Sequence, residues 1–248
     1  MRRYLLAFSL VGLTFFALAH DAAADLLTEV SFNGGAFVPI CTALPGGTCV
    51  GSASGGGLLL NMAAAQSNSP GNATLTAVLL SSAVSLTNTN TSGTATAHLL
   101  IGDTSWAVPT GAVTMLSHIG GSVAVGGPLN TMAFFSSFDP GTGQNVSPGT
   151  FNTPAVSPNI SAAGSYDATS SVAIPLVSVP PSFAMTENLT ITLSAGSIMN
   201  YSTSTTLSPG TTLSPVPELA SLLLVGTSLI GLGVSLRRKR AVSSQSAA

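Results

Sequence analysis

Two histidines, His98 and His118, are the residues of the central part of this chain best suited to acid–base chemistry. A Ser-His-Asp scheme for nucleophilic hydrolysis can be written from either histidine, Asp103 and one of many serines. However, the chain lacks a G-x-S-x-G motif, and its serines are so numerous that a serine near a histidine carries little information. The sequence therefore does not favour a hydrolase, and we expect no catalytic residues.

The acidic side chains of the central part are scattered, and none lies in a D-x-D-x-D-G calcium loop. We therefore expect solvated loop acids at Asp103, Asp139, Asp167 and Glu187. Three aromatic side chains could form a sugar-stacking platform, although single aromatics more often pack in a core: Trp106, Tyr166 and Tyr201. We expect neither a cofactor nor a bound metal.

Cys41 and Cys49 flank the short segment TALPGGT, which contains a Pro-Gly-Gly turn signal. Two thiols without a third and fourth ligand make a poor zinc site, so a disulfide is the expected outcome in an oxidising compartment. Closing so short a loop stabilises a fold by about 2–3 kcal/mol.

The basic residues lie only at the two ends of the chain, since no Lys or Arg occurs between Tyr4 and Leu236. The central part carries carboxylates alone, and it has no cations with which to neutralise phosphates. Nucleic acid is therefore excluded as a partner. Ser, Thr, Asn and Gly must supply the hydrated surface, which is typical of exported proteins of a matrix or wall.

The N-terminal segment, residues 1–24, has the pattern of a secretory signal peptide. Arg2 and Arg3 precede an apolar stretch, and small residues come before the cleavage site that we predict between Ala24 and Asp25. We therefore expect the chain to be exported across the inner membrane.

Residues 219–236 form an uncharged stretch near the C-terminus, which is long enough as a helix, about 27 Å, to cross a bilayer. Four consecutive cations follow it: Arg237, Arg238, Lys239 and Arg240. Cations resist translocation, so we expect a membrane-spanning helix that stops transfer there and leaves residues 241–248 as a cytoplasmic tail.

Val216, Pro217 and Glu218 come directly before this stretch. Together with the apolar span and the segment LRRKR, they resemble the PEP-CTERM sorting signal of Gram-negative bacteria over residues 216–240, with Leu219 in place of the family's second proline. The resemblance implies anchoring in membrane lipid, processing near the motif by an exosortase, and release to the cell surface or beyond.

The central part, residues 25–200, alternates mostly with period two. In NLTITLSAG, residues Leu189, Ile191 and Leu193 share one face, and TATAHLLI places Ala95, Ala97, Leu99 and Ile101 on one face in the same way. Val78, Leu80, Val84 and Leu86 also alternate with their neighbours. Turn signals separate such runs, and no helical period persists, so we predict an all-β ectodomain, an antiparallel β-sandwich or jelly roll. The repeated TTLSP indicates an extended stalk over residues 201–215.

The expected function is that of an exported, non-enzymatic surface or matrix protein with a structural or adhesive role. PEP-CTERM proteins are often encoded beside exopolysaccharide genes, so the resemblance implies a place in biofilm and exopolysaccharide as a partner. One alternative is a carbohydrate-binding or ice-binding β-sandwich module, and another is a secreted hydrolase, which would bring His98 or His118 within reach of a carboxylate and a serine in a cleft.

Overall fold

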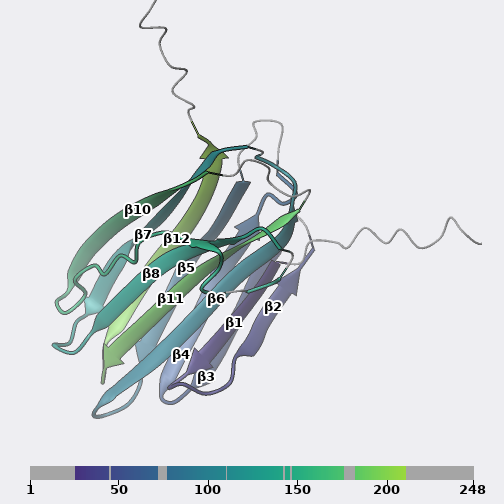
Figure 1. Cartoon of the computed structure of the whole chain (residues 1–248). Helices are drawn as coiled ribbons and strands as arrows, with labels where there is room; N and C mark the ends of the chain where they lie inside the picture. Colours follow the sequence, from purple (N-terminus) through teal and green to yellow (C-terminus); the bar gives the residue numbers. More distant parts are fainter. Residues whose placement is uncertain are drawn as a thin grey trace, which may run out of the picture. The chain divides into compact units, whose positions relative to one another are not determined.

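The computed structural model describes residues 26–44, 46–71, 77–109, 111–141, 143–145, 147–175 and 182–210 (Figure 1). These residues form twelve β-strands and no helix, and they belong to one compact unit that ends at Gly210. Several predictions lie outside them: the cleavage site at Ala24 and Asp25, the motif Val216 to Glu218, the span 219–236 and the cations Arg237 to Arg240. Within the described part, no helix is long and apolar enough to cross a bilayer.

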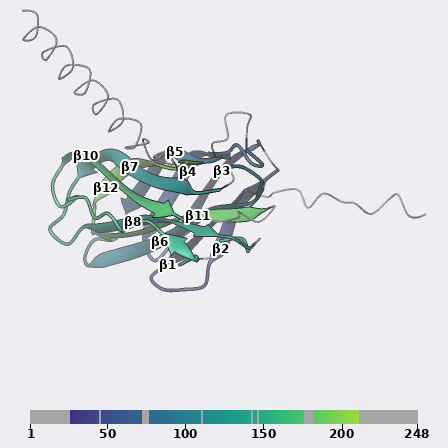
Figure 2. The ribbon, with the colours of Figure 1, turned by 45° about the horizontal axis from the view of Figure 1, so that its top comes forward.

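The strands form two sheets of six strands each, and every pairing is antiparallel. In spatial order, sheet A contains β2 (Val38–Ala43), β1 (Leu26–Phe32), β6 (Thr94–Trp106), β11 (Phe183–Ser194), β8 (Thr131–Asp139) and β9 (Phe151–Asn152). Sheet B contains β10 (Gly164–Ile174), β7 (Val113–Val125), β12 (Ile198–Pro209), β5 (Ala77–Asn88), β4 (Leu58–Ser67) and β3 (Thr48–Gly55). Figure 2 shows the sheets as two layers, which confirms the predicted antiparallel sandwich.

Side-chain alternation places the core between the layers. The predicted inward faces of β6 and β11 are confirmed, because Leu99, Ile101, Leu189 and Ile191 are all buried. In the first half of β11, from Phe183 to Leu189, the residues of both faces are buried. The ring of Phe183 stacks on Trp106 with centroids 6.3 Å apart and lies 4.9 Å from that of Phe138. These aromatic rings fill the core at the end of the sandwich where β6 and β8 end and β11 begins.

The predicted face of β5 is wrong over its first half. Leu79 is fully buried, whereas Val78 and Leu80 are only half-buried. Further along, Val84 and Leu86 point inward as expected. The register between β5 and β12 shifts by one residue in between, and such a bulge reverses which side chains face the core.

The predicted stalk is also wrong over residues 201–209, because β12 runs from Ile198 to Pro209 in the interior of sheet B. It pairs with β5 on one side and β7 on the other. Tyr201 and Leu207 are buried, and their burial, together with pairing on both sides, favours a strand in spite of the stalk-like composition. Residues 211–215 lie beyond the described part of the chain.

The predicted disulfide between Cys41 and Cys49 is confirmed, with the two Cα atoms 5.7 Å apart. Cys41 belongs to β2 at one edge of sheet A, and Cys49 belongs to β3 at one edge of sheet B. The bond therefore joins the two sheets as well as closing the loop between them.

Candidate functional site

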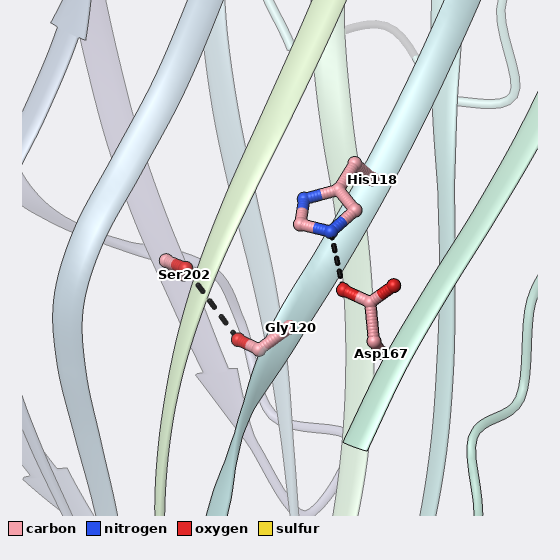
Figure 3. Close-up of polar contacts among 4 residues, drawn as sticks. All are labelled: His118, Gly120, Asp167 and Ser202. Carbon is pink, nitrogen blue, oxygen red and sulfur yellow. Dashed lines mark hydrogen bonds and ion pairs between the residues drawn. The ribbon is translucent and has the colours of Figure 1, made fainter. Parts of the chain in front are cut away.

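An exposed His-Asp pair lies on the outer face of sheet B. The Nε2 atom of His118 on β7 is 2.5 Å from Oδ1 of Asp167 on the neighbouring β10, and the two side chains are 38% and 72% exposed. In the register, Asp167 stands opposite Gly120, two residues beyond His118 on the same face of β7. Figure 3 shows the imidazole and the carboxylate pointing toward each other across the two strands.

The nearby serine is not arranged as a nucleophile. Ser202 on β12 stands opposite Gly120, and its hydroxyl donates a long hydrogen bond of 3.5 Å to the Gly120 carbonyl oxygen (Figure 3). A Ser-His-Asp triad needs a hydrogen bond from the serine hydroxyl to the imidazole. Within the described part of the chain, the imidazole of His118 is hydrogen-bonded to Asp167 and not to a serine. The geometry is therefore a His-Asp pair without the third member of a triad.

His98 occupies the outer face of sheet A, as its position in the alternation of β6 predicts. It is half-buried rather than simply solvated. Its Nε2 atom is 3.0 Å from the side-chain oxygen of Asn188, and the Phe37 ring meets the imidazole edge-on with centroids 4.9 Å apart. These contacts hold the ring against the sheet, and they include no carboxylate.

Asp103 is fully buried, so the prediction of a solvated loop acid is wrong for it. It lies on β6, where the Ser67 hydroxyl donates to Oδ2 and the backbone amide of Thr104 donates to Oδ1 over 2.6 Å. The indole of Trp106 donates to the Asp103 carbonyl oxygen. Asp103 thus stabilises the end of this strand, while Asp167, which the hydrolase scheme did not include, is the carboxylate beside His118.

Glu187 is the second buried acid, with only 2% of its surface exposed, so its prediction as a loop acid is also wrong. It points into the sandwich from β11, and both of its oxygens accept hydrogen bonds from β12 across the core. The Thr205 hydroxyl donates to Oε1 over 3.0 Å, and the Thr203 hydroxyl donates to Oε2. A buried carboxyl needs such partners, because even a neutral polar group buried without one costs on the order of 2–7 kcal/mol, and an ionised carboxylate costs far more.

A chain of hydroxyl groups extends from this carboxyl in both directions. On one side, the Thr203 hydroxyl is 2.6 Å from that of Ser81 on β5. On the other, the hydroxyls of Thr205 and Ser136 are 2.5 Å apart, and Ser136 accepts from Ser117 over 2.6 Å. Ser117 in turn contacts the hydroxyl of Thr153 at 2.9 Å. We call this set the buried hydroxyl network; it consists of Ser81, Ser117, Ser136, Thr153, Glu187, Thr203 and Thr205.

Burial raises the pKa of Glu187 from its usual value of 4.5 to about 8, and the hydrogen bonds from Thr203 and Thr205 oppose this shift without cancelling it. Apolar side chains, including Leu99, Phe134 and Leu189, line the space around the carboxyl. Glu187 is therefore mostly protonated at neutral pH. In that form the carboxyl donates to one of the two threonine hydroxyls, which reverses that hydrogen bond.

The proposed aromatic platform does not form. Trp106 and Tyr201 are buried in the core, and burial raises the pKa of the Tyr201 phenol far above its usual range. Tyr166 is half-buried on β10, and its hydroxyl donates to the Asn200 carbonyl oxygen over 3.1 Å. The core alternative for single aromatics is thus confirmed for Trp106 and Tyr201.

A row of short polar side chains instead crosses the outer face of sheet B. The register places these residues directly opposite one another on six successive strands: Ser165, Ser122, Asn200, Ser85, Asn61 and Ser52. Five of them are exposed and Ser85 is half-buried. With neighbouring strands about 4.8 Å apart, the row extends over about 24 Å. It presents hydroxyl and amide groups without any charge.

The described residues contain no cluster of three or more His, Cys, Asp or Glu side chains that could hold a metal ion. The chain matches no protein-family model and no curated protein.

The period-two alternation of the sequence indicates the burial of part of the hydroxyl network, although the polar character of these residues suggests exposure. Glu187 has the same parity as Leu189 and Leu193, so the period-two alternation that correctly predicted their burial also points Glu187 inward. Ser136 shares its face with Phe134 and Phe138 in the same manner. The partners of these polar groups, however, come from the opposite sheet, and sequence spacing did not indicate them.

Proposed function

We propose that this protein is an exported bacterial surface protein that its C-terminal segment holds at the inner membrane until an exosortase processes it near Val216, Pro217 and Glu218. The observation that carries the proposal is the order of three parts, namely this motif, the apolar residues 219–236 and the cations 237–240. The apolar residues partition into lipid, and the cations stay on the cytoplasmic side. The ectodomain then lies outside the inner membrane.

The interior position of β12 in sheet B supports attachment of the folded body through its C-terminal segment. This strand ends at Pro209, and only six residues, 210–215, separate it from the sorting motif that begins at Val216. It pairs along its length with β7 and β5. A load applied through the C-terminal segment would therefore act on an interior strand, whose ladders on both sides must shear together, rather than on an edge strand that can peel away.

We further propose that the role of the body is structural or adhesive rather than enzymatic, with exopolysaccharide as the contact partner. The uncharged row of Ser and Asn side chains on sheet B supports this idea, because hydroxyl and amide groups at regular spacing can exchange hydrogen bonds with a hydrated, neutral polymer. The same row favours a carbohydrate-binding module as the second candidate function. Binding of the protein to a glycan array, lost on replacing Asn61 and Asn200 by Ala, would separate this candidate from an inert scaffold.

Mapping the C-terminus of protein released from cells that express the full chain tests the sorting proposal. We expect the released form to end near Pro217 or Glu218. Replacing Arg237 to Arg240 by Ser should abolish this cleavage, whereas replacing the tail residues 242–245 by Ala, as a matched control, should leave it unchanged. If the chain stays in the membrane with an intact Ala248, the sorting proposal is wrong and the segment is only an anchor.

A further inference from the structure

The edges of the two sheets differ in how they are protected against pairing with another strand. An edge strand offers unpaired N–H and C=O groups, and proteins block it with short strands, prolines, bulges or charges. β2 contains Pro39, and its pairing with β1 shifts register between Thr28 and Glu29. β3 has a register shift between Cys49 and Gly51 and is tied to β2 by the disulfide. β9 has only two residues.

β10 lacks the short length, the proline and the bulge that protect the other edges. This strand forms the edge of sheet B and runs for 11 residues, Gly164 to Ile174, without Pro, Lys or Arg (Figure 1). Every residue from Gly164 to Ile174 pairs with β7 in one continuous register, so the strand has no bulge. Asp167 is its one charged residue. A long and regular backbone edge is therefore open along β10 in the described part of the chain.

The inner face of β10 is also incompletely covered. Tyr166, Ala168 and Val172 pack against the core but remain only half-buried. The strand that ends sheet A at this side of the sandwich, β9, is too short to cover all of them. A further strand beside β10 would remove apolar surface of these side chains from water, which adds a hydrophobic contribution to the backbone hydrogen bonds.

We infer that β10 pairs with β10 of a second copy of this chain, in antiparallel orientation, so that two B sheets become one continuous sheet. The partner is a second copy because the free N–H and C=O groups of one β10 can pair with those of another β10 in antiparallel orientation. Since the other three edges are blocked, β10 can pair with no other edge of a second copy, and the assembly closes as a two-fold dimer rather than growing into a filament. Over 11 residues the ladder provides on the order of ten hydrogen bonds between the chains.

The distribution of charge is compatible with full overlap of the two strands. Overlap of Gly164 to Ile174 with itself places Thr169 on the two-fold axis and Asp167 opposite Ser171 of the second copy. The two Asp167 carboxylates are then four residues apart along the strands, about 13 Å, so like charges do not stand directly opposite each other. In this register Ser165 stands opposite Ala173 of the second copy, so the polar rows of the two copies do not meet.

A single cysteine on the axis tests this arrangement. The two native cysteines are bonded to each other, so the full chain has no free thiol as background. In Thr169→Cys, the two introduced thiols would face each other across the antiparallel pair, where Cα atoms lie about 4.5–5.5 Å apart, within the range for a disulfide. We expect the full chain, in membranes under mild oxidation, to migrate mainly as a covalent dimer on a non-reducing gel.

Ser165→Cys is the matched control, because Ser165 is exposed on the same face of the same strand. In the proposed register its equivalent in the second copy is eight residues away along the strands, about 27 Å, so this variant should stay monomeric. Equal cross-linking of both variants, or cross-linking of neither, would overturn the inference.

A charge on the axis provides a second measurement without cross-linking. Thr169→Lys places two ammonium groups opposite each other and should raise the Kd of dimerisation at least tenfold, while Ser165→Lys should change it little. Light scattering of the full chain in detergent measures both. A full chain that is monomeric without substitution, or a dimer that Thr169→Lys does not weaken, would refute the pairing, and neither result depends on whether an exosortase processes the chain.

Discussion

The stability of the body should fall as pH rises from about 4.5 to 8, and Glu187 should be the main cause. In the unfolded chain this carboxyl ionises near its usual pKa of 4.5, whereas burial keeps it protonated in the fold up to about pH 8. Within this window the folded state binds more protons than the unfolded state, so the free energy of unfolding decreases as pH increases. Below the window both states are protonated, and the contribution of Glu187 is constant.

The size of the effect follows from the shift in pKa. Each pH unit of the window costs about 1.4 kcal/mol, so the full window amounts to about 5 kcal/mol, a large fraction of the 5–15 kcal/mol that is typical of a domain. Tyr201 is the titratable group that interacts with Glu187, and burial keeps its phenol neutral throughout this range. Its titration therefore does not mask that of Glu187.

Glu187→Gln removes the ionisable group but keeps hydrogen-bond partners for Thr203 and Thr205, namely the amide oxygen and the amide NH₂ group. The network can accept the amide because either hydroxyl of the pairs Ser81–Thr203 and Ser136–Thr205 can act as the donor. We expect this variant to lose most of the pH dependence between pH 5 and 8 that the natural chain shows. The free energy of unfolding of the variant, measured relative to that of the natural chain, should therefore be higher at pH 8 than at pH 4.

Urea titrations at a series of pH values measure this prediction. The chain has a single tryptophan, and Trp106 is fully buried, so its fluorescence reports unfolding of the body. Asp139→Asn, a substitution at the surface end of β8, is the control that should leave the slope in place. If the natural chain and Glu187→Gln show the same slope, or if stability rises with pH, the reasoning about the buried carboxyl is wrong.

Three further predictions concern packing and surface pairs, and urea titrations check each of them. Replacing Cys41 and Cys49 together by Ser should lower the free energy of unfolding by about 2–3 kcal/mol, and a reducing agent should lower that of the natural chain equally but leave the variant unaffected. Phe134→Ala should cost about 3–5 kcal/mol, because it empties a fully buried site between the sheets; a loss below 1 kcal/mol would contradict the assigned core. His118→Ala should cost less than about 1 kcal/mol, because its pair with Asp167 lies in solvent, and a larger loss would show a role beyond this pair.

The sandwich itself could be predicted because alternation with period two is a local property of the sequence. Each strand needs one apolar face, and the residues Leu189, Ile191 and Leu193 show it without reference to any other strand. The disulfide could be predicted for a similar reason, since Cys41 and Cys49 are close in the chain. The predicted stalk is wrong over 201–209 because a segment rich in Ser and Thr can also form a strand when alternate residues, such as Tyr201 and Leu207, are buried.

The sequence by itself determined the class of fold, the disulfide, and the distribution of charge that leaves cations only at the ends of the chain. Tertiary structure alone decided that Asp167 rather than Asp103 lies beside His118, and that Glu187 meets Thr203 and Thr205. It also decided which strand is left at an open edge. The physical reason is that these contacts join strands distant in the chain, and their register depends on how whole faces pack and where single-residue bulges occur.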